Sequence, residues 1–122
     1  MKKQLKLLGA AVLGLTLLGI AAPAAHTATT ATTLTAMVVD QTCQGGDDVN
    51  VTLTATLSPP KTGVTYTWDF NNDGIFDTAP SADPTVTHLY PDEANVTATV
   101  KVTKGRRSAT DSVTFVTIRC GG

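Results

Sequence analysis

Apolar and polar residues alternate along most of the chain from Leu34 onward. The pattern is clearest in three runs, 49–57, 64–70 and 96–102, where every second residue is apolar and most residues between are Thr. A period of two places one face of a β-strand toward a core and the other toward water. Val and Thr are β-branched and favour strands over helices. The pattern therefore predicts an all-β domain.

The breaks between these runs contain the residues that turns require, such as Gly45-Gly46, Pro59-Pro60 and Asp73-Gly74. Gly tolerates positive φ and Pro cannot donate to a strand ladder, so we expect loops at these positions. Short strands separated by such loops are typical of an antiparallel β-sandwich, here with about seven strands. The expected strands are 34–39, 49–57, 64–70, 75–77, 85–90, 95–103 and 110–118.

The last of these runs is less regular than the others. Its apolar residues change phase between Phe115 and Val116. A change of phase predicts either a β-bulge or a strand covered on both faces.

The N-terminal region has the three parts of an export signal. Three lysines stand within the first six residues, residues 7–20 are almost wholly apolar, and Ala22-Pro23-Ala24 supplies small residues for cleavage. This arrangement predicts a signal peptide over 1–24. The apolar run is shorter than the roughly 20 residues of a membrane-spanning helix, although an uncleaved anchor is the alternative. The protein is therefore expected to be secreted, periplasmic or on the cell surface of a bacterium, with no membrane span after cleavage.

The rest of the chain divides into two unequal parts. Residues 25–33 are rich in Ala and Thr and contain no large apolar residue. We interpret them as a flexible tether. The folded domain is expected over 34–122.

Charge argues against nucleic acid as a partner. The chain has nine basic and ten acidic residues, and loss of the three signal lysines leaves six against ten, a net charge of about −4. Nucleic-acid binding needs clustered cations on phosphates. The one basic cluster, Lys104, Arg106 and Arg107, is interpreted as a solvated hairpin tip rather than a polyanion site.

The two cysteines, Cys43 and Cys120, lie near the two ends of the folded part. In an exported chain such a pair predicts a disulfide. A metal or redox pair is the alternative, but there is no Cys-x-x-Cys spacing and the chain has only two His. A disulfide closing so long a loop is worth up to about 4.5 kcal/mol on the chain-entropy model.

Three segments resemble a known family. Trp68-Asp69-Phe70 before a Gly-containing turn, then His88-Leu89-Tyr90, then the alternating strand 94–102, resemble the PKD domain over about 34–118. The resemblance departs at Asn71-Asn72-Asp73-Gly74, where the family usually has Gly-Asp-Gly. It implies an immunoglobulin-like antiparallel β-sandwich in an extracellular protein, used as a spacer or as a protein- or carbohydrate-contacting module.

Four residues of these segments are expected to form the core motif. Trp68 and Phe70 share the inward face of one strand and would anchor a small aromatic core. Tyr90 is expected to act as a tyrosine corner, with its hydroxyl bonded to nearby backbone. His88 is interpreted as a packed or backbone-bonded residue rather than a ligand or base.

The segment after Trp68 resembles the beginning of a Ca²⁺ loop, because oxygens recur at alternate positions and Gly74 would allow the sharp turn. Position 12 of such a loop is Pro80 instead of the bidentate Glu. A structural turn, in which Asp69 and Asn71 bond backbone amides, is the alternative. The candidate calcium ligands are Asp69, Asn71, Asp73, Ile75 (through its carbonyl) and Asp77.

No enzyme signature is present in the sequence: there is no Gly-x-Ser-x-Gly, no His-Glu-x-x-His and no phosphate-binding Gly loop. We expect no catalytic residues and no cofactor, with calcium as the one candidate ion. The first functional candidate is a module that contacts an extracellular protein or polysaccharide. A structural spacer, stabilised by calcium or not, is the second. A surface binder that uses the outward Thr rows is the third.

Overall fold

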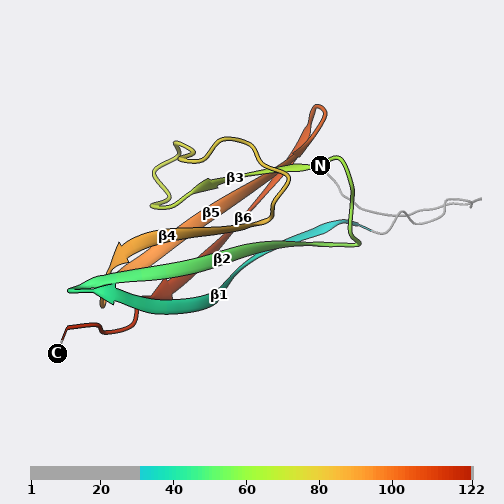
Figure 1. The fold of residues 1–122 in the computed structure, drawn as a ribbon. Helices are drawn as coiled ribbons and strands as arrows, with labels where there is room; N and C mark the ends of the chain where they lie inside the picture. The colour runs from blue at the N-terminus through green and yellow to red at the C-terminus, as the bar shows by residue number, and fades with distance from the viewer. Residues whose placement is uncertain (1–30, 122) are drawn as a thin grey trace, which may run out of the picture. The chain divides into compact units, whose positions relative to one another are not determined.

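The computed structural model describes residues 31–121, which contain six β-strands and no helix. The predicted signal peptide and most of the predicted tether lie outside the described residues. Within the described part there is no helix that could cross a membrane. The strands, labelled in Figure 1, are β1 (Thr33–Gly45), β2 (Asp48–Ser58), β3 (Thr65–Asp69), β4 (Thr85–Pro91), β5 (Asn95–Lys104) and β6 (Arg107–Val116).

The strands form two antiparallel sheets of three strands each. One sheet has the order β1-β2-β4 and the other the order β3-β5-β6. The two sheets face one another, and β1 of the first also contacts β6 of the second. The expected all-β sandwich is confirmed.

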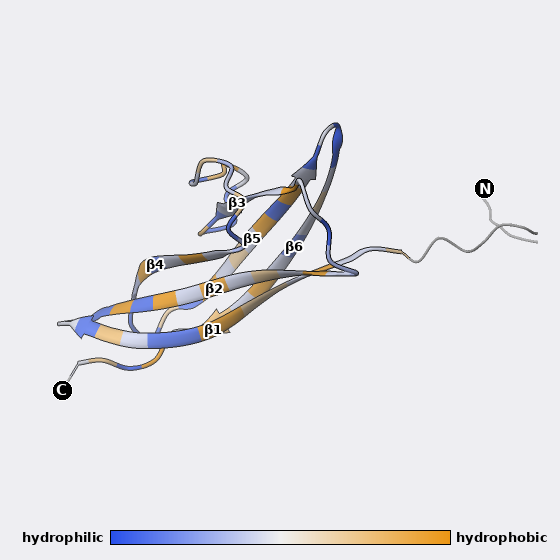
Figure 2. Ribbon diagram, turned by 45° about the vertical axis from the view of Figure 1, so that its right-hand side comes forward, coloured by the Kyte–Doolittle hydropathy of each residue, from blue (hydrophilic) through white to orange (hydrophobic). Residues whose placement is uncertain are grey.

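The core lies between the sheets and follows the alternation of the sequence. Val49, Val51 and Leu53 on β2 are completely buried, and so are Ala98 and Val100 on β5. Figure 2 shows the corresponding hydrophobic bands separated by paler or polar ones along both strands. The driving force is the transfer of these apolar faces out of water.

The predicted strand at 75–77 is wrong. This segment is part of a loop that folds back on β3: the Asp77 N–H donates to the Trp68 carbonyl (2.7 Å), and Ser81 forms an isolated bridge with Tyr66. None of the side chains of this segment belongs to the core between the sheets, and Ile75 is 69 % exposed. A segment with no core to face gains nothing by extending into a full strand.

The same loop is held against the outer face of the second sheet. Thr99 donates a hydrogen bond to the Asn72 side chain (2.8 Å), and the Lys101 ammonium lies 4.9 Å from the centre of the Phe76 ring. The loop therefore has a defined place although it contains no regular structure.

Strand β1 is longer than the predicted 34–39 at both ends. Thr33, placed in the tether by the prediction, is its first residue, and the strand continues to Gly45 through register shifts at Val38/Asp40 and Cys43/Gly45. Each shift is a β-bulge or similar irregularity that changes which face a side chain occupies. The apolar alternation is lost at these shifts, so the second half of β1 could not be recognised as a strand from the sequence.

The last strand, β6, ends at Val116. Neither a β-bulge nor a strand covered on both faces therefore explains the change of phase of the apolar residues at this point. Val116 is exposed, and Thr117 turns inward, where its hydroxyl donates to the Pro91 carbonyl (2.7 Å). The Ile118 N–H then donates to the Gln41 side chain (2.9 Å). The tail leaves the sheet and crosses to β1.

Candidate functional site

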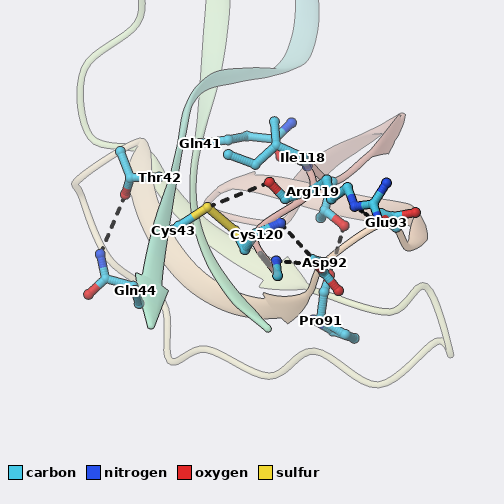
Figure 3. The surroundings of a disulfide bond; sticks show 12 residues. Gln41, Thr42, Cys43, Gln44, Pro91, Asp92, Glu93, Ile118, Arg119 and Cys120 are labelled. Carbon is cyan, nitrogen blue, oxygen red and sulfur yellow. Dashed lines mark hydrogen bonds and ion pairs between the residues drawn. A yellow bond between two sulfur atoms is a disulfide. The ribbon is translucent and has the colours of Figure 1, made fainter. Parts of the chain in front are cut away.

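The tail after β6 is joined to β1 by a disulfide, shown in Figure 3. Cys43 and Cys120 are 77 residues apart in sequence, and their Cα atoms are 5.6 Å apart. The bond links a strand of the first sheet to the chain that leaves the second. The expected pairing is confirmed, and it leaves no free cysteine in the described part of the chain.

Asp92, in the turn between β4 and β5, holds the backbone around Cys120. Its carboxylate accepts the N–H of Cys120 at 3.0 Å and that of Gly121 at 3.3 Å (Figure 3). These two hydrogen bonds, the Cys120 bond first, lower the pKa of Asp92 below its ordinary value. The nearby ion pair between Arg119 and Glu93 is exposed and adds little.

Trp68 and Phe70 occupy the core as expected. Trp68 pairs with Val100 in the second sheet and is 2 % exposed. Its indole Nε1 is buried and has no hydrogen-bond partner among the described residues. The ring therefore stabilises the sandwich through apolar contact alone.

Aromatic rings form a row that connects the two sheets. The Phe70 ring stacks on the His88 ring (4.0 Å between centroids, 14° between planes). His88 meets Tyr90 edge-on at 4.7 Å, and Tyr90 meets Phe115 edge-on at 5.7 Å. Such stacked and edge-to-face pairs are the preferred aromatic geometries. Phe115 is the member that the sequence did not single out, although the irregular last run pointed to it.

Tyr90 joins the row to the backbone. Its hydroxyl donates to the Phe70 carbonyl at 2.7 Å, and burial, with the charges of Asp77 and Asp69, raises its pKa. The expected hydrogen bond to backbone is present. However, its acceptor lies 20 residues away, at the end of β3, rather than a few residues upstream. Tyr90 therefore ties the two sheets together instead of closing a local corner.

His88 lies within the row. Burial lowers its pKa from the ordinary value, and the Asp77 charge opposes that effect only in part. The neutral ring is thus favoured in the folded protein. The stacking on Phe70 agrees with the interpretation of His88 as a packed residue.

The carboxylates of the turn after Trp68 accept hydrogen bonds from its own backbone. Asp69, only 1 % exposed, accepts the N–H of Gly74 (2.8 Å) and, more weakly, that of Asp73 (3.3 Å). Asp73 accepts the Ile75 N–H, and Asp77 accepts the Phe70 N–H, both at 2.8 Å. These contacts close the turn without help from another group.

Asn71 completes the network around two of these carboxylates. With its amide nitrogen turned toward them, it donates to Asp69 Oδ1 (2.9 Å) and to both oxygens of Asp73 (3.2 Å). Asp77 is bound to Phe70 instead. No three His, Cys, Asp or Glu side chains within residues 31–121 lie close enough to hold a metal ion together. Among the five candidate ligands, the three carboxylates thus accept backbone N–H groups of the turn, and Asn71 donates to two of these carboxylates.

A hollow of about 500 Å³ opens beside this turn. Aromatic rings, an amide and a carboxylate surround it, and Leu89, at its border, is 53 % exposed. The residues that line it are Phe70, Asn71, Asp77, His88, Leu89, Tyr90 and Pro91. We call it the aromatic hollow.

The Thr rows of the outer faces are paired internally. Thr97 and Thr114 share a hydrogen bond across β5 and β6 (2.9 Å), and Thr99 and Ser112 share another (2.6 Å). Cross-strand hydroxyl pairs of this kind support the sheet itself.

Two facing antiparallel sheets, an aromatic row between them and a turn closed by carboxylates define an immunoglobulin-like β-sandwich module. The family model of the PKD domain matches residues 33–117, and the chain belongs to this family. PKD domains occur in extracellular or cell-surface proteins and are generally non-catalytic binding or structural modules. No curated protein and no solved structure matches the chain.

Proposed function

We propose that this protein is a secreted, non-catalytic module that contacts a carbohydrate or protein polymer outside the cell, and that the aromatic hollow is its contact site. The hollow is the observation that carries the proposal. It brings aromatic residues together with an amide and a carboxylate along one concave surface. Ligand sites in proteins are typically concave and largely apolar, with a few polar groups that orient the ligand.

The chemistry of the hollow suits a sugar ring in particular. The apolar C–H face of a sugar packs on aromatic and aliphatic groups, while its hydroxyls bond Asn71 and Asp77 at the border. Tyr90 cannot serve as the donor, because its hydroxyl is already bound to Phe70. The polar specificity of the site would therefore come from the turn rather than from the aromatic row.

Secretion is supported by the sequence before the domain and by the disulfide. Residues 1–24 have the pattern of a signal peptide, and disulfides persist in oxidising compartments outside the cytosol. The lysine-rich beginning of the signal is typical of a bacterial source.

Binding to insoluble polymers tests the proposal. The purified domain is incubated with chitin, cellulose, peptidoglycan and fibrillar collagen, and the retained fraction is measured. Leu89→Ser should reduce retention severalfold, because it removes the exposed apolar border of the hollow. Met37→Ser is the matched control, since Met37 is also an exposed apolar residue but lies on β1, outside the hollow. Retention by no polymer, or equal loss in both variants, would refute the proposal.

A structural spacer is the second candidate, and the path of the chain favours it. The chain enters at the end of the sandwich where Thr33 pairs with Ser58. It leaves at the opposite end, where Gly121 meets Asp92. A spacer needs entry and exit at opposite ends. A domain that binds none of the four polymers and still places flanking segments apart would support this candidate instead.

We propose that the turn after Trp68 is a structural element held by its own amides, so that calcium adds nothing to it. The hydrogen bonds accepted by Asp69, Asp73 and Asp77 support this. Melting curves should coincide in about 2 mM CaCl₂ and in EDTA, because the carboxylates already have partners. A higher melting temperature in calcium that Asp73→Ala abolishes would assign a Ca²⁺ site to the turn instead.

A further inference from the structure

A second hollow lies at the end of the sandwich where β1 begins, away from the aromatic hollow. Its volume is about 480 Å³. Both ribbon views show β1 and β6 close together near their ends and diverging toward their beginnings (Figures 1 and 2). We call this opening the basic groove. Its lining residues are Thr32, Leu34, Leu57, Lys61, Val64, Val102, Lys104, Arg107, Ser108 and Ala109.

The floor and the rim of the basic groove differ in chemistry. Leu57, Val64 and Val102 form an aliphatic floor, continuous with the core. Lys61, Lys104 and Arg107 are exposed and line it, and no carboxylate is among the lining residues. The only salt bridge among residues 31–121 joins Arg119 to Glu93, so none of these three cations is paired there. The groove therefore complements an anionic ligand with an aliphatic part.

One wall of the basic groove is a strand edge. The Ala36 N–H donates to the Asp111 carboxylate on β6 (2.8 Å) and so points away from β2. Because peptide groups along a strand alternate in direction, the N–H and C=O of Leu34 point to the same side as the Ala36 N–H. β1 has β2 as its one ladder partner in the described part of the chain. The edge at Leu34 is thus open to another extended chain.

We propose that the basic groove binds an extended acidic peptide segment of a partner protein, added as a strand along the Leu34 edge of β1. Backbone groups of the peptide pair with Leu34, an aliphatic side chain enters the floor, and flanking carboxylates meet Lys61, Lys104 and Arg107. A sugar is disfavoured because the groove contains no aromatic ring. The first 30 residues of this chain supply no such ligand, since they contain no Asp or Glu.

A synthetic ligand tests this site. A blocked octapeptide of alternating Glu and Val is titrated into the domain and followed by calorimetry and by amide exchange in NMR. The double variant Lys104→Glu/Arg107→Glu should weaken binding by about tenfold or more, because it reverses the charge on one side of the groove. Lys101→Glu is the single-charge control and should leave the affinity within about twofold, since Lys101 lies outside the groove. Circular dichroism establishes that all variants are folded.

Three further readings decide the outcome. Binding should weaken as NaCl rises from about 50 to about 300 mM. Exchange of the Leu34 N–H should slow in the complex, because only strand addition covers that group. A Lys/Val octapeptide should not bind.

The proposal is overturned if the Glu/Val peptide binds the double variant as well as the wild type, or if Leu34 exchange is unchanged. It is also overturned if phosphatidylglycerol vesicles bind at this end while the peptide does not. Salt-sensitive self-association abolished by the double variant would assign the groove to a second copy instead.

Discussion

At the residue scale, Tyr90 shows how one buried hydroxyl group can support a hydrophobic core. Its ring packs between His88 and Phe115, and its hydroxyl satisfies the carbonyl of Phe70 where β3 ends. A buried carbonyl without a hydrogen-bond partner destabilises the folded state. The Tyr90 hydroxyl therefore allows the chain to end β3 in the interior of the sandwich. Trp68 acts differently, because its Nε1 has no partner among the described residues and the ring contributes by packing.

Replacing Tyr90 by Phe isolates the hydroxyl. The variant keeps the ring contacts but leaves the Phe70 carbonyl unpaired, so the free energy of unfolding should fall by about 1–3 kcal/mol in urea denaturation. Tyr66→Phe is the control. Tyr66 is also buried, but its hydroxyl has no hydrogen bond to another described residue and is not a buried unpaired group. Equal losses in the two variants would show that the bond to Phe70 contributes nothing of its own.

His88 should make stability depend on pH. Burial lowers its folded-state pKa below 6.5, so the unfolded chain binds the proton more readily. Stability is then complete above the unfolded pKa and is lost as pH falls through the folded pKa. Melting temperature should decline on acidification below about pH 6.5, before carboxylates titrate near pH 4. His88→Gln should remove this decline and His26→Gln should preserve it; an unchanged profile in the first variant would contradict the assignment.

At the scale of elements, the turn after β3 replaces an expected strand. Its carboxylates bind its amides, and two residues, Asn72 (φ 56°) and Gly74 (φ 90°), have left-handed backbone conformations. Residues with a Cβ adopt such conformations only with a loss of free energy, and this loss is smaller for Asn than for most other residues. The turn geometry is thus a local consequence of Asn, Asp and Gly at these positions.

Gly74 provides the test of that turn. Gly74→Ala should lower the free energy of unfolding by about 1–2 kcal/mol, because the positive φ is strained for any residue with a Cβ. An added Cβ meets no atom within 4 Å, so the loss would come from the backbone alone. Gly74→Asn should cost less than Ala. Chemical denaturation gives the order, and a greater loss with Asn would exclude backbone strain as the cause.

At the scale of the whole molecule, the sandwich is closed differently at its two ends. The Cys43–Cys120 disulfide and the Asp92 hydrogen bonds fasten the tail to the first sheet at one end. At the other end β1 and β6 diverge around the basic groove, and the Ala36–Asp111 hydrogen bond marks where they begin to meet. Within residues 31–121, the end at the disulfide is thus held by a covalent link and by hydrogen bonds, whereas the end at the basic groove has no covalent link.

Loss of the disulfide should weaken the whole domain. Cys43→Ser combined with Cys120→Ser should lower the free energy of unfolding by about 2–4.5 kcal/mol, since a long loop in the unfolded chain is no longer closed. Urea denaturation under oxidising conditions measures the difference. Dithiothreitol should weaken the wild type to a similar degree and leave the double variant unchanged. A double variant as stable as the oxidised wild type would show that the hydrogen bonds of Asp92 suffice.

The sequence by itself determined the class of fold, the core faces of β2 and β5 and the pairing of the cysteines. Alternation such as Val49, Val51 and Leu53 has one stable interpretation, because a period of two can bury one face only as a strand. The tertiary structure decided the second half of β1, the loop in place of a strand at 75–77, and the contact of Tyr90 with Phe70. It also decided that Lys61, Lys104 and Arg107 surround one groove. These features depend on which edges and side chains meet across the two sheets, and that proximity has no periodic signal in the chain.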